Sequence, residues 1–390
     1  MTRRLHTYSL VAIVAAVSAG QALARDPKRI QLADGIVLTP LLDVSEAYDD
    51  NIYEANVNAD SSTWVTTISP SLLLDAVQGV NHYQLEYGFE TDYFHSTDQD
   101  HNTDHSLRGM AEIALNKTNR FELSANYDRI ENVSDTSVIG QNDKFEITRA
   151  DANYIYGAPS GPFSMELGVN HVWFRTFNSG TLNSDREYDK PGASATGYFR
   201  VGPKTRALVE YRYDDYDYLL SSSALDSTKD TYLIGLTWAA TARTVGTIKF
   251  GYEERDFDSN AKKDKDGSSW EADLTWQPTQ RATLIFNTSK GTEEGSVSED
   301  LVEVERFKAS WNHQIAPRIS SDVSYAYLDE EYQNILNRKD EVNEVAVGIN
   351  FDATRWMTVG VGYRYKDRDS NVPVRDYDRN VYMVSLNLSL

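Results

Sequence analysis

The chain has 390 residues, no cysteine and a formal net charge of −21 at pH 7. The lack of cysteine excludes disulfide frameworks, thiol nucleophiles and thiolate metal sites. The acidic balance argues against a nucleic-acid partner, because binding to nucleic acid requires basic patches.

The N-terminal segment has the features of an export signal. Arg3 and Arg4 precede an apolar run from Leu10 to Val17, and Ala22-Leu23-Ala24 fits the small-x-small rule of signal peptidase. The apolar run is far shorter than the roughly 20 residues of a spanning helix. We therefore expect residues 1–24 to be a cleaved signal peptide, residues 25–36 a short periplasmic segment and residues 37–390 one folded domain.

From Thr39 onward, apolar and polar residues alternate, and helical periodicity is almost absent. In the clearest case Leu85, Tyr87 and Phe89 are interleaved with Glu86 and Glu90. Such alternation predicts β-strands with one apolar and one wet face. Comparable apolar faces follow at Phe121–Tyr127, Phe163–Val169, Ala207–Tyr213, Tyr232–Trp238, Trp270–Trp276 and Val345–Phe351. These are more apolar faces than one β-sandwich of ordinary size can bury.

Aromatic residues gather at the ends of these segments, as expected of girdles at two membrane interfaces. Trp270 and Trp276 are one such pair, and Tyr363 and Tyr365 are close together in another segment. The connections alternate between short turns and long, mostly acidic loops. Counting the segments between connections gives about eighteen strands, starting near residues 37–48 and ending at 379–390.

These features predict an all-β fold, namely a transmembrane antiparallel β-barrel with short periplasmic turns and long acidic extracellular loops. Backbone groups in lipid cannot bond to water, so the sheet must close on itself. A barrel of this size should enclose water, because side chains cannot fill it. Pro70 predicts a bulge or kink in the second strand. The expected neighbours are outer-membrane lipid, lipopolysaccharide and the barrel-assembly machinery, which would read the final strand up to Leu390.

The stretch from Pro40 to Tyr53, followed by Trp64 and Ile68–Leu72, resembles the putative beta-barrel porin 2 family. The resemblance implies an outer-membrane barrel linked to exopolysaccharide or capsule synthesis, with polysaccharide and periplasmic export components as partners. The family motif consists of Tyr48, Asp49, Asp50, Asn51, Ile52 and Tyr53. This combination of residue types does not indicate a catalytic site. It predicts a strand end followed by an Asx-type turn.

Polar residues that alternate with the apolar faces are candidates for the pore lining. They are Gln84, Glu86, Glu90, Asp92, Arg108, Glu112, Glu122, Asn126, Asp128, Arg149, Asp151, Glu166, Arg212, Lys249, Glu271, Asp273, Arg306, Lys308, Glu344 and Arg364. The acidic excess predicts a pore that favours cations. The alternative is that they only solvate a lumen and pair across strands. Tyr198 and Trp356 have the same inward parity and could stack on sugar rings.

One expected extracellular loop is rich in histidine and aspartate. It contains His95, His101 and His105 with Asp92, Asp98, Asp100 and Asp104. Divalent metal binding or a hydrolase of the Asp/His type is conceivable, but a solvated acidic loop is the expectation, because no nucleophile with an oriented base is defined. Phosphate-binding loops and zinc spacings are absent from the sequence. We expect no enzymatic activity, no cofactor and no bound metal.

Three functions fit this sequence. The leading hypothesis is an outer-membrane channel for export of an exopolysaccharide or capsular polysaccharide. The alternatives are a diffusion porin for small solutes and a non-conducting structural or adhesive barrel. Conductance distinguishes the structural or adhesive barrel from the two channels. The polysaccharide phenotype of a deletion strain distinguishes the export channel from the diffusion porin.

Overall fold

The structure is a computed structural model that describes residues 29–56, 61–96, 100–134, 136, 141–158, 161–180, 182–241, 243–295, 300–333 and 337–389. The expected signal peptide and Leu390 lie outside these residues. The described residues form 19 strands and two short 3₁₀ helices, η2 (Ser184–Arg186) and η3 (Pro373–Arg375). Among them, no helix has the length and apolar character needed to cross a bilayer.

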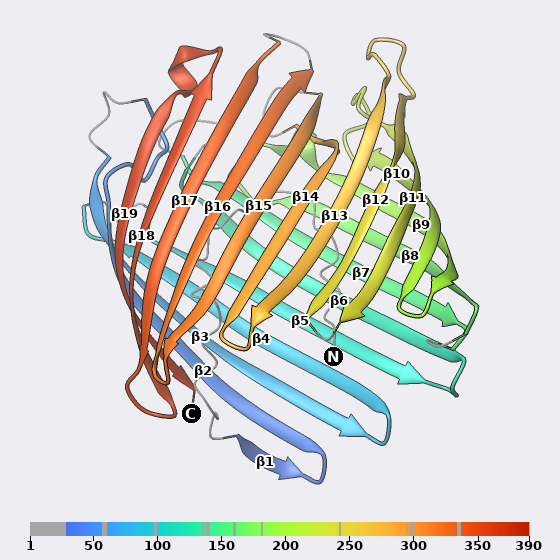
Figure 1. The fold of residues 1–390 in the computed structure, drawn as a ribbon. Coiled ribbons are helices and arrows are strands. Elements are labelled where there is room, and N and C mark those ends of the chain that lie inside the picture. Colours follow the sequence, from blue (N-terminus) through green and yellow to red (C-terminus); the bar gives the residue numbers. More distant parts are fainter. Residues whose placement is uncertain are drawn as a thin grey trace.

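Eighteen long strands make up the barrel (Figure 1). They are β2 (Ile36–Asp49), β3 (Thr63–Gln78), β4 (Asn81–Phe94), β5 (Asn102–Ala114), β6 (Asn119–Asn132), β7 (Asp143–Tyr156), β8 (Phe163–Thr176), β9 (Tyr188–Gly202), β10 (Thr205–Tyr218), β11 (Ser227–Thr241), β12 (Thr244–Phe257), β13 (Lys265–Thr279), β14 (Ala282–Glu294), β15 (Leu301–Ala316), β16 (Ile319–Gln333), β17 (Lys339–Asp352), β18 (Met357–Ser370) and β19 (Tyr377–Ser389). Each pairs antiparallel with the next, and β19 pairs with β2. The predicted closed barrel of about eighteen strands is therefore confirmed.

A nineteenth strand, β1 (Ile30–Ala33), pairs with the start of β2. It falls in the segment before residue 37, where the sequence suggested no strand. Its four residues are all exposed, so no buried face marks it in the sequence.

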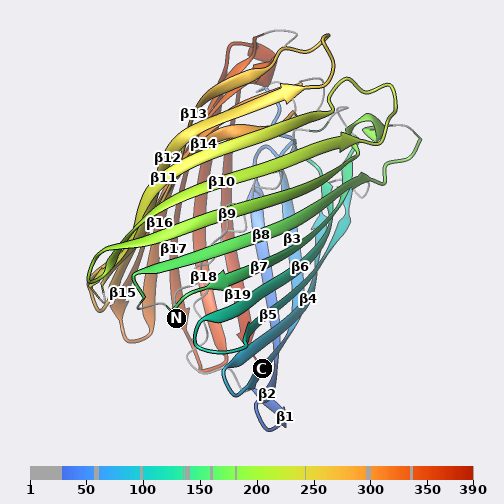
Figure 2. The same ribbon diagram turned by 90° about the vertical axis from the view of Figure 1, so that its right-hand side faces the viewer.

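The two ends of the barrel differ in their connections. Two-residue turns join β3 to β4 and β9 to β10, whereas the β2–β3 and β8–β9 connections span more than ten residues each. β1 and the end of β19 lie at the short-turn end (Figure 2). In outer-membrane barrels the long loops face the outside, and we call the long-loop end the outer end.

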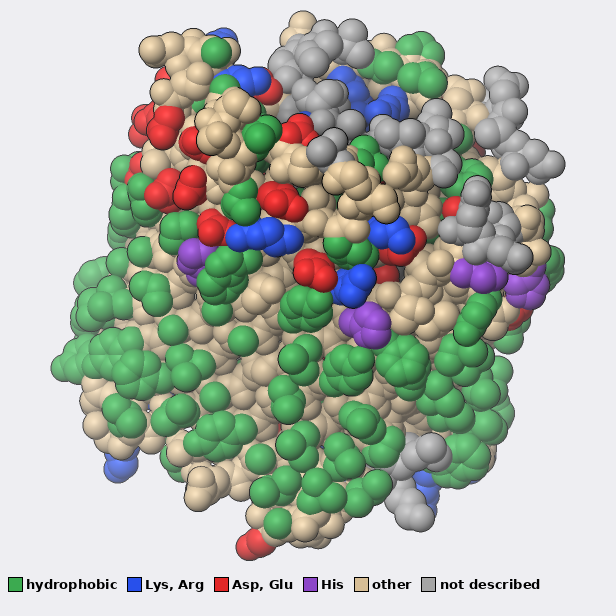
Figure 3. Space-filling model, turned by 180° about the vertical axis from the view of Figure 1, so that it is seen from behind, with side chains coloured by type: hydrophobic (Ala, Val, Ile, Leu, Met, Phe, Trp, Pro, Cys, Tyr) green, Lys and Arg blue, Asp and Glu red, His purple; other side chains and the backbone are tan. Residues whose placement is uncertain are grey.

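The outward faces of the strands are apolar around the barrel. Leu85, Tyr87 and Phe89 on β4 are 48%, 43% and 39% exposed, and the Glu86 between them faces the other side. Cross-strand pairing preserves the face, since Tyr87 lies opposite Leu107 on β5. Figure 3 shows the apolar band with charged side chains above it, towards the outer end. A one-residue slip of any strand would turn its charges to the lipid.

Pro70 lies within β3 without disturbing its register. It pairs with Leu42 on β2. On the other side, the ladder to β4 skips positions 69 and 70 and resumes unchanged at Ser71, opposite Gly88. The ladder contains no bulge here, because the strand accommodates the missing N–H donor by leaving a gap. The kink stays a prediction.

Candidate functional site: the barrel lumen

All the predicted pore-lining residues lie on strands and have the parity opposite to the exposed apolar set. They are Gln84, Glu86, Glu90 and Asp92 on β4; Arg108 and Glu112 on β5; Glu122, Asn126 and Asp128 on β6; Arg149 and Asp151 on β7; Glu166 on β8; Arg212 on β10; Lys249 on β12; Glu271 and Asp273 on β13; Arg306 and Lys308 on β15; Glu344 on β17; and Arg364 on β18. The barrel thus turns these side chains toward one enclosed lumen.

The inner face of β3–β7 is strongly acidic, and we call it the acidic wall. It carries Asp75, Glu86, Glu90, Asp92, Asp104, Glu112, Glu122, Asp128 and Asp151, against the cations Arg108, Arg120 and Arg149. Glu90 lies directly opposite Asp104, and Glu112 lies directly opposite Glu122. Such like-charge pairs are destabilising in a sheet, so a structural role does not account for them.

Hydroxyl groups hold several of these carboxylates. The Ser69 hydroxyl donates to Glu90 at 2.7 Å, and the Ser124 hydroxyl donates to Asp151 at 3.0 Å. Arg108 is 4.0 Å from Asp128. Hydrogen bonds from neutral donors orient the carboxylates without placing a positive charge beside them.

The inner face of β10–β13 is different, because its charges pair with one another. The Arg212 guanidinium binds both oxygens of Glu271, at 2.5 and 2.9 Å. Lys249 lies 3.2 Å from Glu271 and 2.8 Å from Glu210, and Arg212 also contacts Glu210. We call these four residues the paired wall. Glu210 was not among the sequence candidates, although its position between Val209 and Tyr211 gives it the same parity.

Further candidates also have cross-strand partners. Arg306 forms a salt bridge with Glu293, which the sequence analysis did not select. Asn287 donates to Asp273 at 2.6 Å. Tyr198 faces inward as expected: it is buried, donates to Glu166 at 3.3 Å and lies under Arg206.

The inward assignment of Trp356 is wrong. Trp356 lies in the turn between β17 and β18 and is 44% exposed at the short-turn end. Its backbone carbonyl accepts a hydrogen bond from the Ser389 N–H. The alternation rule does not apply to a residue outside the strands, and strand boundaries are the least certain part of such an assignment.

The family motif closes the barrel where the first and last long strands meet. The Asn51 N–H donates to the Asp49 carboxylate at 3.0 Å, which is the predicted Asx-type turn. The Asn51 side chain then donates to the Asp378 carbonyl at 2.9 Å, and Asp50 accepts two hydrogen bonds from Asn380. The motif thereby ties the end of β2 to the start of β19.

A charged cluster lies directly behind this turn, and we call Asp49, Glu54, Lys366, Tyr377 and Arg379 the seam cluster. Arg379 binds Asp49 at 2.6 Å and Glu54 at 2.8 Å, while Lys366 lies 2.6 Å from Glu54. The Tyr377 hydroxyl donates to Glu54 at 2.8 Å. Burial alone would raise the pKa of Glu54, but the charges of Lys366, Arg379 and Arg368 hold that pKa well below its usual range. Glu54 therefore stays ionised although it is buried.

Several segments fold inward at the outer end. Ile52 is 3% exposed, and Tyr53 donates to Asp100 at 2.6 Å. From the β8–β9 connection, the Arg186 guanidinium donates to the Gly295 carbonyl at 3.5 Å. The Arg186 contact links two segments that are 109 positions apart at this end of the barrel.

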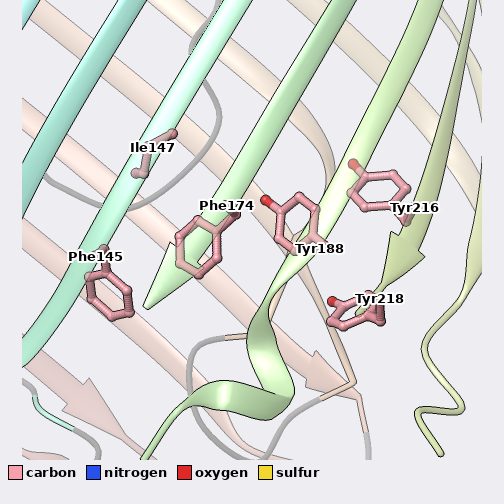
Figure 4. Packing of buried hydrophobic residues seen from close by; sticks show 6 residues of the cluster. All are labelled: Phe145, Ile147, Phe174, Tyr188, Tyr216 and Tyr218. Carbon is pink, nitrogen blue, oxygen red and sulfur yellow. The ribbon is translucent and has the colours of Figure 1, made fainter. Parts of the chain in front are cut away.

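An aromatic cluster packs on the inner wall near the outer end. It comprises Phe145, Ile147, Phe174, Tyr188, Tyr216 and Tyr218 from β7–β10 (Figure 4). The Phe174 and Tyr188 rings stack at 5.3 Å with 7° between their planes, and Arg255 lies 3.9 Å from the Tyr216 ring centroid. All six residues are buried, so this cluster stabilises the wall and offers no open aromatic track along the lumen.

The three histidines of the predicted acidic loop each contact a different residue. His95 contacts the Thr66 hydroxyl at 2.8 Å, His101 accepts from the Phe94 N–H at 3.1 Å, and His105 contacts the Tyr87 hydroxyl at 3.1 Å. Asp98 lies outside the described residues. Within the part of the chain that the structure describes, no group of three or more His, Asp or Glu side chains is arranged to hold a metal ion.

A closed 18-strand barrel with an apolar outer band and a charged lumen defines a porin-like protein of the outer membrane. The chain belongs to the putative beta-barrel porin 2 family, whose model matches residues 35–390. The family resemblance seen in the sequence is thereby confirmed. No curated protein matches the chain.

Solved outer-membrane barrels share the fold. OccAB2 of Acinetobacter baumannii has a TM-score of 0.50 and 12% identity, with 90% of this chain and 98% of OccAB2 covered. OccK9 (OpdG) of Pseudomonas aeruginosa has a TM-score of 0.50 and 10% identity, with 90% and 98% covered. The FrpB iron transporter of Neisseria meningitidis (F3-3 variant) has a TM-score of 0.46 and 10% identity; 85% of this chain is covered but only 62% of FrpB, less than two thirds. At these identities the likeness shows the fold alone.

Proposed function

We propose that the barrel is a water-filled channel through which hydrophilic solutes cross the outer membrane, with a preference for cations. The observation that carries this proposal is the acidic wall on β3–β7, where carboxylates such as Glu90 and Asp104 face each other across strands. The role is transport, and catalysis forms no part of it.

Electrostatics support the direction of the preference. The paired wall neutralises itself, because Arg212 and Lys249 bind Glu210 and Glu271. The acidic wall has few cations, so its field is left to act on ions in the lumen. A surface of one sign in a confined lumen raises the local concentration of counter-ions.

Planar-bilayer recording of the purified protein tests the proposal. In a salt gradient, the expected result is stepwise conductance with a reversal potential on the cation-selective side. Anion selectivity would contradict the proposed preference. Folded protein without conductance would contradict the channel and favour a structural or adhesive barrel.

Export of an exopolysaccharide or capsular polysaccharide is a second proposal, which rests on the family resemblance. The lumen gives it limited support, since the inward aromatic residues Phe174, Tyr188 and Tyr216 are buried and cannot stack on a passing sugar in this conformation. A deletion strain that loses surface polysaccharide and regains it with the wild-type gene would support export. Channel activity with unchanged surface polysaccharide would count against it.

A further inference from the structure

The ladder between β13 and β14 stops short at the outer end. Pairing runs up to Trp270 opposite Lys290, although β13 extends to Lys265 and β14 to Glu294. Beyond this point β13 remains paired only with β12, and the ribbons of β13 and β14 diverge (Figure 1). In this fully described stretch, residues 265–269 of β13 thus form a free strand edge.

The corresponding part of β14, Gly291–Glu294, lies inside the lumen, and we call it the β14 end. The Thr292 N–H donates to Glu253 of β12 at 2.7 Å, and Lys229 of β11 donates to the Thr292 carbonyl at 3.3 Å. Since β13 lies between β12 and β14 in the sheet, these contacts require the β14 end to pass across the inner side of β13.

Charged groups hold the β14 end in this position. Arg255 of β12 is completely buried and lies 2.5 Å from Glu294. The Tyr218 hydroxyl of β10 also donates to Glu294. The β14 end is therefore held by side chains of β10, β11 and β12, and Arg306 of β15 binds Glu293. Its backbone also stays paired with β15, from Gly291 opposite Val304 to Glu294 opposite Leu301.

Side chains bridge the gap left in the wall between β13 and β14. Glu303 of β15 lies 2.9 Å from Lys265 on one side and 2.9 Å from Lys290 on the other. A cavity of about 10 Å³ remains, lined by lumen-facing Glu253 and outward-facing Glu303 together with Gly267 and Gly291. It has space for about one water molecule. Among the described residues, no strand pairs with this edge of β13.

We propose that the β14 end is a gate with two positions. In the observed position it lies in the lumen and narrows the outer mouth. In the second position it adds to the free edge of β13 and completes the wall, and residues 301–304 of β15 move with it as its paired strand. The existing register sets the new pairs: Gly291 opposite Ser269, Thr292 opposite Ser268, Glu293 opposite Gly267 and Glu294 opposite Asp266. The role of this gate in conduction rests on the proposed channel function.

Each position offers hydrogen-bond partners to the backbone of the β14 end, as two stable positions require. The inward position uses the bonds of Glu253, Lys229, Arg255 and Tyr218. The outward position replaces them with ladder hydrogen bonds on an edge that otherwise depends on water. Outward movement would uncover Arg255 on the Tyr216 ring, so an anionic group entering the lumen would compete for Arg255 and favour the open state.

The natural absence of cysteine permits a direct test by disulfide trapping. The variant S268C/T292C places two thiols at a pair that exists only in the outward position. The control A272C/T288C places them at a pair already present lower in the same ladder. After mild oxidation in membranes, we expect both variants to form disulfides. We also expect E294Q, which weakens the contact with Arg255, to increase the yield for S268C/T292C several-fold and to leave the control unchanged.

Single-channel recording of the same variants tests the effect on the mouth. Oxidised S268C/T292C should have a higher conductance than the reduced form, with no difference for A272C/T288C. A disulfide in the control without one in S268C/T292C, in both backgrounds, would overturn the gate. Trapping without a change in conductance would overturn its effect on the mouth. If neither the wild type nor any variant conducted, the proposed channel function would be refuted. Disulfide formation in S268C/T292C would still show whether the β14 end moves.

Discussion

At the scale of single residues, Arg379 is the group on which the barrel closure depends most. It binds Asp49 of β2 and Glu54 of the following loop, and both carboxylates are almost completely buried. Arg379→Ala would leave two buried charges without this partner, which costs about 3–5 kcal/mol. Urea unfolding of the barrel in detergent micelles should show this loss.

The matched control is Lys339→Ala. Lys339 pairs with Glu331 at the same end of the barrel, but both side chains are largely exposed. Its removal should change the unfolding midpoint far less than Arg379→Ala does. Equal effects of the two substitutions would contradict a special role of the seam cluster.

Glu54 should make the stability of the folded barrel depend on pH. Its pKa in the folded protein lies well below the usual range, because Lys366, Arg379 and Arg368 outweigh the effect of burial. A lowered folded-state pKa stabilises the protein above the ordinary glutamate pKa of about 4.3, and this stabilisation is lost as the pH falls further. Wild type should therefore be more stable than Glu54→Gln at pH 7, and the difference should shrink from about pH 5 toward pH 3. A constant difference over that range would refute the assignment.

At the scale of the strand, alternation makes neighbouring positions respond in opposite ways. Leu123 of β6 faces the lipid, while Ser124 faces the lumen and donates to Asp151. Leu123→Arg should cost up to about 2–4 kcal/mol, because it places a cation in hydrocarbon. Ser124→Arg should be tolerated, because it adds a cation to the acidic wall. Folding yield into lipid vesicles, measured for both variants, checks the contrast; similar yields would mean that β6 has a different orientation.

At the scale of the whole molecule, the two inner walls together set the selectivity. Replacing Glu90 and Asp104 with their amides removes two opposed charges from the acidic wall. The reversal potential in a salt gradient should then shift toward zero. The control Asp230→Asn removes a carboxylate that accepts a hydrogen bond from outward-facing Tyr211 and should leave the selectivity as it was. If the control shifted the potential as much, the preference would come from overall charge and not from the lumen wall.

The sequence by itself determined the barrel, because the membrane imposes a simple rule on each strand. Apolar and polar residues must alternate, so the lipid-facing set and its opposite could be assigned residue by residue, as for Leu85 and Glu86. The strand count followed from the turns. This rule applies only to strands with one apolar face. β1 is exposed on both faces, so its four residues indicated no strand, and Trp356 lies in a turn.

Only the tertiary structure decided which inward residues meet. Arg212 and Glu271 are 59 positions apart, and Asp49 and Arg379 are 330 apart. Such contacts depend on strand order, stagger and barrel closure, which alternation does not encode. The same reason explains why Glu54 and Glu294 were missed. Both lie at strand ends or in loops that fold back into the lumen, and there the partners across the barrel decide where a side chain points.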